Sequence, residues 1–137
     1  MGIDGLFGGM SVSASGMAAQ RARMNVIASN IAHAQDSDRG DGTAYVRKEV
    51  IFESALDSAG NELVRVKSVA EDTRTPMQRI HAPGHANADK DGFVTMPNVS
   101  PVFEMTDLVS ASRSYEANLQ VSRMLKDMSE RALELGR

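Results

Sequence analysis

The sequence contains no cysteine. This absence excludes disulfide bonds, thiolate metal sites and cysteine nucleophiles. It is compatible with the cytoplasm and with extracytoplasmic compartments alike, so cysteine usage does not locate the protein.

Aromatic residues make up only 4% of the 137 residues, and tryptophan is missing. This scarcity argues against a stacking platform for single-stranded nucleic acid. The net charge is −3, and the lysines and arginines are scattered among acidic residues, so no basic arm for a phosphate backbone is visible. We therefore expect no nucleic-acid partner.

Long apolar runs are also missing. No stretch approaches the roughly 18 apolar residues that a membrane span needs, so we expect no membrane insertion. The first ten residues, MGIDGLFGGM, lack the basic region and the continuous apolar region of a cleaved signal. If the protein works outside the cytoplasm, we expect its export to proceed without a cleaved signal peptide.

Apolar residues recur with helical spacing over residues 10–34. One stripe repeats every seven residues, which is close to two helical turns, and contains Met10, Met17, Met24 and Ile31. A second stripe lies about 200° further round the helix, at about 100° per residue, and contains Val12, Ala19 and Val26. A two-helix hairpin uses only one such side, so the second stripe predicts a partner from another chain.

Glycine and serine interrupt this first helix near its start. Gly8, Gly9 and Gly16 each cost roughly 1 kcal/mol relative to alanine in a helix, and the neighbouring serines add smaller penalties. We therefore interpret the first turns as weakly helical in isolation and ordered by packing on assembly.

The composition changes after residue 34. Residues 35–44, QDSDRGDGTA, favour turns, and two β-rich stretches follow at residues 45–52 and 63–69, with a turn at residues 57–61. A third strand is predicted at residues 93–96, and together the three strands would form one small sheet. Proline, glycine and polar residues predict a long loop over residues 73–91.

A second long helix is predicted from about residue 102 to residue 135. Its apolar positions advance by three or four residues and form one seam: Leu108, Ala111, Tyr115, Leu119, Ser122, Leu125, Met128, Ala132 and Leu135. The predicted fold class is mainly α with a small β insertion, in which the terminal helices pair as an antiparallel coiled coil with the β insertion at one end. Residues 1–36 and 102–137 would form the two halves of a helical core domain, and residues 37–101 the insertion.

Three features could indicate chemistry at a site. Residues 87–98, NADKDGFVTMPN, resemble a calcium loop, but Asn98 replaces the bidentate glutamate at its last position. An Asp/Gly turn that enters a strand explains this stretch better, and weak cation binding is left open. His81 and His85 are four residues apart, but Pro83 and Gly84 between them argue against a metal-binding helix.

His33 has no serine or cysteine partner arranged for nucleophilic catalysis. We therefore predict no enzyme activity, no cofactor and no resident metal.

The two ends of the chain carry motifs of a known family. The first motif contains Met24, Asn25, Ala28, Ser29, Asn30, Ile31 and Ala34, followed by Tyr45 and Arg47. The second contains residues 92–94 and 96–99 and continues through residues 110–115 to Ala117 and Asn118. The sequence resembles the axial proteins of the bacterial flagellum, the rod and hook family, and among them the proximal-rod members. His33 departs from the asparagine that is usual in this family.

The resemblance implies a structural rod subunit of the flagellar basal body. It implies export by the flagellar type III apparatus and assembly through the terminal helices into a periplasm-spanning tube that transmits motor torque. The implied partners are copies of itself, other proximal-rod and distal-rod subunits, and export-gate and ring components. The predicted assembly interface contains Met10, Met17, Met24, Asn25, Ile27, Ser29, Asn30, Ile31, Leu108, Tyr115, Asn118, Leu119 and Leu125.

Two other functions stay open from the residues alone. The chain could be a soluble coiled-coil adaptor that forms a closed dimer, with the β insertion as a binding module. A calcium-binding module at residues 87–98 is the third alternative. Tyr115 fits both a core aromatic in the helix seam and a contact between subunits.

Overall fold

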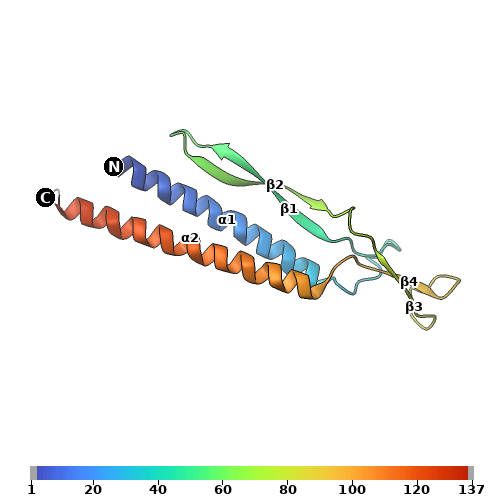
Figure 1. Ribbon diagram of the computed structural model, residues 1–137. Helices are drawn as coiled ribbons and strands as arrows, with labels where there is room; N and C mark the ends of the chain where they lie inside the picture. The colour runs from blue at the N-terminus through green and yellow to red at the C-terminus, as the bar shows by residue number, and fades with distance from the viewer. Residues whose placement is uncertain (1–2, 136–137) are drawn as a thin grey trace.

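Two long helices form the body of the protein. The computed structural model describes residues 3–135, and the other residues of the predicted terminal segments lie outside this range. Helix α1 (Ile3–Ala32) packs along helix α2 (Pro101–Leu135), and the two run antiparallel, with the N- and C-termini at the same end (Figure 1). At 1.5 Å per residue, the helices are about 45 and 50 Å long. The mainly helical fold class with a small β part is confirmed.

Helix α1 begins earlier than the predicted residue 10, and two of its glycines are packed against α2. A Cβ atom at Gly9 would lie 3.0 Å from Leu125 Cδ1, and one at Gly16 would lie 2.9 Å from Asn118 Nδ2. These glycines let α2 approach closely, and this packing outweighs their low helix propensity. Among the described residues, no helix is long and apolar enough to span a membrane.

Strands β1 (Lys48–Leu56) and β2 (Glu62–Glu71) form an antiparallel hairpin. The turn at residues 57–61 is confirmed: Asp57 accepts hydrogen bonds from the backbone N–H groups of Ala59 and Asn61. Gly60 has a φ of 81°, a left-handed conformation that favours glycine.

The predicted three-stranded sheet is wrong. Strand β4 (Phe93–Met96) occupies the predicted third-strand position, but it pairs with β3 (Gln78–His81) in a separate two-stranded sheet. Strand β3 lies inside the segment predicted as loop. Its four residues, QRIH, contain one β-branched side chain, so composition gave little signal for a strand.

The β1–β2 hairpin lies along α1, whereas the β3–β4 sheet lies beyond the helix ends that are far from the termini (Figure 1). The prediction that the whole β insertion lies at one end is therefore wrong for the hairpin. Ser15 Oγ accepts a hydrogen bond from Val64 N, and Val26 lines a groove with Val50 and Phe52. The side of α1 that was predicted to need another chain is thus partly covered by the protein's own hairpin.

The end of the predicted α2 seam is also wrong. Met128, Ala132 and Leu135 are exposed, with Leu135 90% exposed. Gly9 is level with Leu125, so Met128 still lies beside the described part of α1, whereas Ala132 and Leu135 lie beyond the level of Ile3, its first described residue. The seam therefore ends at Leu125, the last of its residues that contacts α1 at a glycine.

We predict that Ile27→Ala lowers the free energy of unfolding by about 2–4 kcal/mol, because it removes a buried side chain between α1 and its neighbours. Val102→Ala, on an exposed position of α2, should change it by less than about 0.5 kcal/mol. Chemical denaturation followed by circular dichroism measures both values. Equal losses for the two variants would contradict the packing described here.

Candidate assembly interface

A buried polar cluster joins the two helices to the β hairpin. We call it the polar joint and define it by Asn30, Tyr45, Arg47, Asp72, Asn98 and Glu104. Asn30, near the end of α1, is 0% exposed. Its Nδ2 donates to Glu104 Oε2 at 3.0 Å and to Lys48 O at 2.8 Å. Its Oδ1 accepts from Tyr45 Oη and from Lys48 N. One side chain therefore links α1, the start of β1 and α2.

Glu104, in the first turn of α2, is the largest fully buried side chain and is 1% exposed. Arg47 Nε donates a hydrogen bond to its Oε1 at 2.6 Å, and Asn30 Nδ2 donates one to its Oε2. A buried carboxylate is costly unless it is paired and hydrogen-bonded, and here both oxygens have donors. Removing either donor leaves a buried charge uncompensated, so the cluster acts as a unit.

Asn98 and Asp72 extend the joint towards the β3–β4 sheet. Asn98 Oδ1 accepts from Arg47 N at 2.7 Å, and its Nδ2 donates to the carbonyls of Asp72 and Thr75. Hydrogen bonds, chiefly from the Thr75 hydroxyl and the backbone N–H of Arg74, lower the pKa of Asp72 to about 2 from its ordinary value of 3.8. Asp72 is therefore a carboxylate that stays ionised far into the acidic range.

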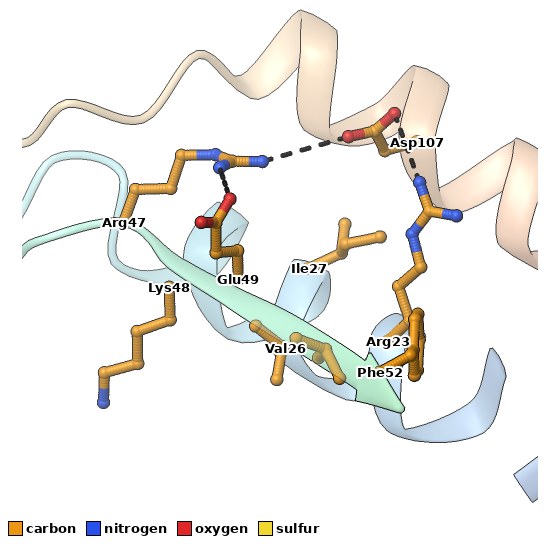
Figure 2. A pocket seen from close by; sticks show the side chains of 9 residues that line it. Arg23, Val26, Ile27, Arg47, Lys48, Glu49, Phe52 and Asp107 are labelled. Atoms are coloured by element: carbon orange, nitrogen blue, oxygen red, sulfur yellow. Dashed lines mark ion pairs between the residues drawn. The ribbon is translucent and has the colours of Figure 1, made fainter. Parts of the chain in front are cut away.

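A groove beside the joint is lined from α1, β1 and α2 (Figure 2). Asp107 lies between two arginines there, 3.7 Å from Arg23 and 3.9 Å from Arg47. The groove holds about 270 Å³, less than the roughly 300–1,000 Å³ of ligand pockets. Its arginines and carboxylates largely pair with one another, so it ties the elements together and offers little to a small ligand.

The residues of the predicted assembly interface differ in how far they are buried. Ile27 and Asn30 are buried, and Asn25 is exposed. The others are half-buried: Met10, Met17, Met24, Ser29, Ile31, Leu108, Tyr115, Asn118, Leu119 and Leu125. Of these residues, Leu125, Asn118 and Tyr115 contact α1 within the chain and Asn30 lies at the polar joint. The role of the predicted set between chains stays a prediction.

The exposed apolar side chains were not part of the predicted interface. Among the described residues, half of the large ones lie on α2: Val102, Phe103, Met105, Val109, Val121, Met124, Met128, Leu133 and Leu135. The others are Phe7 and Val12 on α1 and, on the strands, Ile51, Leu56, Val64, Val66, Val69, Ile80 and Phe93. Val102 and Phe103 are 72% and 74% exposed. A group of large exposed apolar residues on one helix marks an interaction surface. The spacing of residues 102, 105 and 109 was a sequence signal for a second face of α2.

Two singled-out residues have specific contacts. Arg21 donates to Tyr115 Oη at 3.4 Å and lies over its ring, so Tyr115 contacts α1 of its own chain at a half-buried position. His33 Nδ1 lies 2.7 Å from Ser29 O, and its ring stacks on Tyr45 at 4.8 Å. His33 therefore packs against the polar joint.

The segment at residues 87–98 forms a turn that enters β4. Asp89 Oδ1 accepts from the N–H groups of Asp91 and Phe93, and Gly92 has a φ of 79°. His81 lies in β3 and His85 in a turn, so they do not share a helix. Among the described residues, no group of three or more His, Cys, Asp or Glu side chains could hold a metal ion.

We predict that Asn30→Asp lowers the free energy of unfolding by about 3 kcal/mol at neutral pH, because it sets a carboxylate against the buried Glu104 and removes a donor. Asn25→Asp, at an exposed position of the same helix, should have little effect. Chemical denaturation at pH 7 and at pH 4 measures the free energy of unfolding of both variants. The Asn30→Asp loss should shrink at pH 4 as the introduced aspartate becomes protonated, and a small, pH-independent loss would contradict the polar joint.

We also predict that Asp72 contributes stability in a pH-dependent way. Its folded pKa of about 2 lies below its ordinary value of 3.8, so the contribution is present above about pH 4 and is lost as the pH falls towards 2. Asp72→Asn should therefore be less stable than the unmodified chain at pH 6 and approach it near pH 2. Asp127→Asn, at an exposed site, is the control. If the difference in the free energy of unfolding between Asp72→Asn and the unmodified chain does not change with pH, the assigned pKa is contradicted.

Comparison with known proteins gives matches at both ends of the chain. Residues 10–32 match the family described as flagella basal body rod protein, and residues 90–135 match the C-terminal family of the flagellar basal body rod FlgEFG proteins. These two segments cover most of α1 and the β4–α2 region.

Similar proteins extend over nearly the whole chain. The flagellar basal-body rod protein FlgC of Aquifex aeolicus is 41% identical, over 94% of this chain and 96% of that protein. FlgC of Salmonella typhimurium is 41% identical over 91% and 93%, and FlgC of Borreliella burgdorferi is 37% identical over 96% and 97%. The chain therefore belongs to the FlgC family of flagellar basal-body rod proteins.

Proposed function

We propose that the protein is a structural subunit of the proximal rod in the flagellar basal body. The observation that carries this proposal is the near-complete match to FlgC proteins, since it includes both helices and the hairpin between them. The fold supports a structural role because its buried polar groups hold elements together and its largest apolar groups face outwards. We expect no catalytic step, cofactor or resident metal.

The terminal helices supply the proposed assembly surface. Exposed apolar residues of α2 lie on the side away from α1, so a neighbouring subunit can cover them without opening the helix pair. Contacts between unlike surfaces of similar subunits do not close into a dimer and generate helical tubes. The proposed neighbours are copies of this chain, other proximal-rod and distal-rod subunits, and export-gate and ring components.

To transmit torque, a subunit needs helices and strands that do not rotate relative to one another. The polar joint supports this role because Asn30 and Glu104 connect both helices to β1 through short hydrogen bonds. We propose that the subunit leaves the cell through the flagellar type III apparatus, without a cleaved signal peptide, and joins a tube that spans the periplasm.

A soluble dimeric adaptor is the second candidate. The β hairpin favours it, because Leu56 at the hairpin end is 71% exposed and Val64, Val66 and Val69 also face solvent. In this alternative, the hairpin binds a partner and α2 faces the second copy of a closed dimer.

We predict that Met124→Asp leaves the isolated chain folded, because Met124 is 58% exposed, but prevents its incorporation into rods. The gene for the variant replaces the unmodified gene in a flagellated bacterium. Purified basal bodies are then tested for the presence of the chain, and the cells are tested for swimming. Thermal unfolding of the isolated variant verifies the fold.

Leu56→Asp is the matched comparison, an exposed apolar residue on the hairpin. Loss of rods with Met124→Asp and their retention with Leu56→Asp supports the rod subunit. Absence of the unmodified chain from basal bodies, together with a discrete dimer in solution, would favour the adaptor.

A further inference from the structure

The turn of the β1–β2 hairpin meets the start of α1. The hairpin runs along α1 towards the N-terminal end of that helix (Figure 1). Gly8 is buried there, and a Cβ atom at this position would lie only 2.6 Å from Asn61 Oδ1, in the hairpin turn. Atoms that are not bonded to each other do not approach so closely. Glycine at position 8 is therefore what lets the turn lie against the helix.

Asn61 is held in place by the turn itself. Its backbone N–H donates a hydrogen bond to Asp57 Oδ1, and its Nδ2 donates one to Asp57 Oδ2, each at 2.9 Å. Both oxygens of one carboxylate therefore fix Asn61. A side chain at position 8 would have to break these bonds or displace the whole turn.

The hairpin follows one side of α1 from this contact to the polar joint. Gly8 and Ser15 share that side, because seven residues are close to two helical turns. Val64 N donates to Ser15 Oγ at 3.1 Å, and at the far end Lys48 is hydrogen-bonded to Asn30. The groove of about 270 Å³ lies between these contacts. The hairpin is therefore fastened to α1 near both of its ends.

The start of α1 depends on such packing. Gly5, Gly8 and Gly9 all lie within residues 5–9, and each lowers the helix propensity. A short helical segment of this kind is not stable in water by itself. Gly9 faces the other supporting element, since a Cβ atom there would lie 3.0 Å from Leu125 Cδ1 of α2. Successive residues point about 100° apart, so the two neighbouring glycines admit two different partners.

The hairpin depends on α1 in the same way. Among the described residues, β1 and β2 pair only with each other. A single two-stranded hairpin is marginally stable at best in water. Most of β2 is exposed, and α1 is the helix against which both strands pack. Each of the two elements is weak alone, and each supplies a surface that the other needs.

We propose that the β1–β2 hairpin is a strap whose turn, seated on Gly8, keeps the start of α1 helical. Docking of the turn and ordering of residues 7–12 then form one cooperative unit, and release of the turn frees both. Ordering of this segment begins within the single chain, before any assembly. The inference goes beyond the proposed rod function and holds or fails without it, because it concerns the isolated chain.

Hydrogen exchange of the full-length isolated chain tests this coupling from the hairpin side. Gly60 has a φ of 81°, and a Cβ atom there would lie in open space. Gly60→Val therefore strains the turn without contacting α1, because β-branched residues rarely adopt positive φ. We expect amide exchange about tenfold faster in the hairpin and also in residues 7–12. These amides report on the helix, since the first four amides of a helix have no partner within it.

Gly42→Val is the matched control. Gly42 has a φ of 79°, and a Cβ atom there would also lie in open space, but this residue belongs to the loop before the hairpin. The control should leave the exchange of residues 7–12 unchanged. If Gly60→Val speeds exchange in the hairpin alone, or if both variants speed exchange in residues 7–12 equally, the strap is overturned.

A second pair of variants tests the coupling from the helix side. Gly5→Leu and Gly8→Leu both raise the helix propensity of the same segment. A Cβ atom at Gly5 would lie in open space, whereas the leucine at position 8 meets the hairpin turn. We expect Gly8→Leu to speed exchange about tenfold in residues 7–12 and 52–66, and Gly5→Leu to slow it or leave it unchanged.

Equal protection of residues 7–12 by the two leucine variants would overturn the strap, because helix propensity alone would then decide the order of this segment. Circular dichroism verifies that each variant keeps its helices. If Gly8→Leu does not fold, the comparison of Gly60→Val with Gly42→Val decides.

Discussion

The buried carboxylate of Glu104 is the constraint on which the arrangement of the chain depends. A carboxylate that is 1% exposed needs donors on both oxygens, and here one comes from the end of α1 and one from the residue just before β1. These donors, Asn30 and Arg47, are far from Glu104 in the sequence. The paired charge therefore fixes the start of α2 against both other parts at once, and an offset of any of the three elements would leave it unpaired.

This constraint explains how α1 uses its three faces. With the end of α1 fixed at Asn30, α2 runs back along one face and the hairpin along a second, where Ser15 and Val26 meet it. The hairpin can reach that face because β1 begins directly at the polar joint, at Lys48. The third face, which carries Arg21, stays exposed in the single chain.

Helical periodicity predicted the two helices and composition predicted the polar turns, because each of these depends on residues close in sequence. The antiparallel pairing of the helices was inferred from their apolar seams. The motif residues Asn30, Tyr45, Arg47 and Asn98 were also found, but by resemblance, and their mutual hydrogen bonds were not. Glu104 was missed altogether, since a glutamate near a helix start looks like an ordinary first-turn acid. The hairpin position and the β3–β4 pairing depend on contacts between distant residues, which local patterns do not encode.

This arrangement explains why α1 can have a low helix propensity. Its glycines lower its stability as an isolated helix, yet Gly9 and Gly16 are what allow α2 to approach. Most of the stability of α1 must therefore come from the surfaces that cover it. In the single chain, two of its three faces are covered, by α2 and by the hairpin. Any partner that covers the third adds stability to the element that most lacks it, so binding there and the ordering of α1 are thermodynamically coupled.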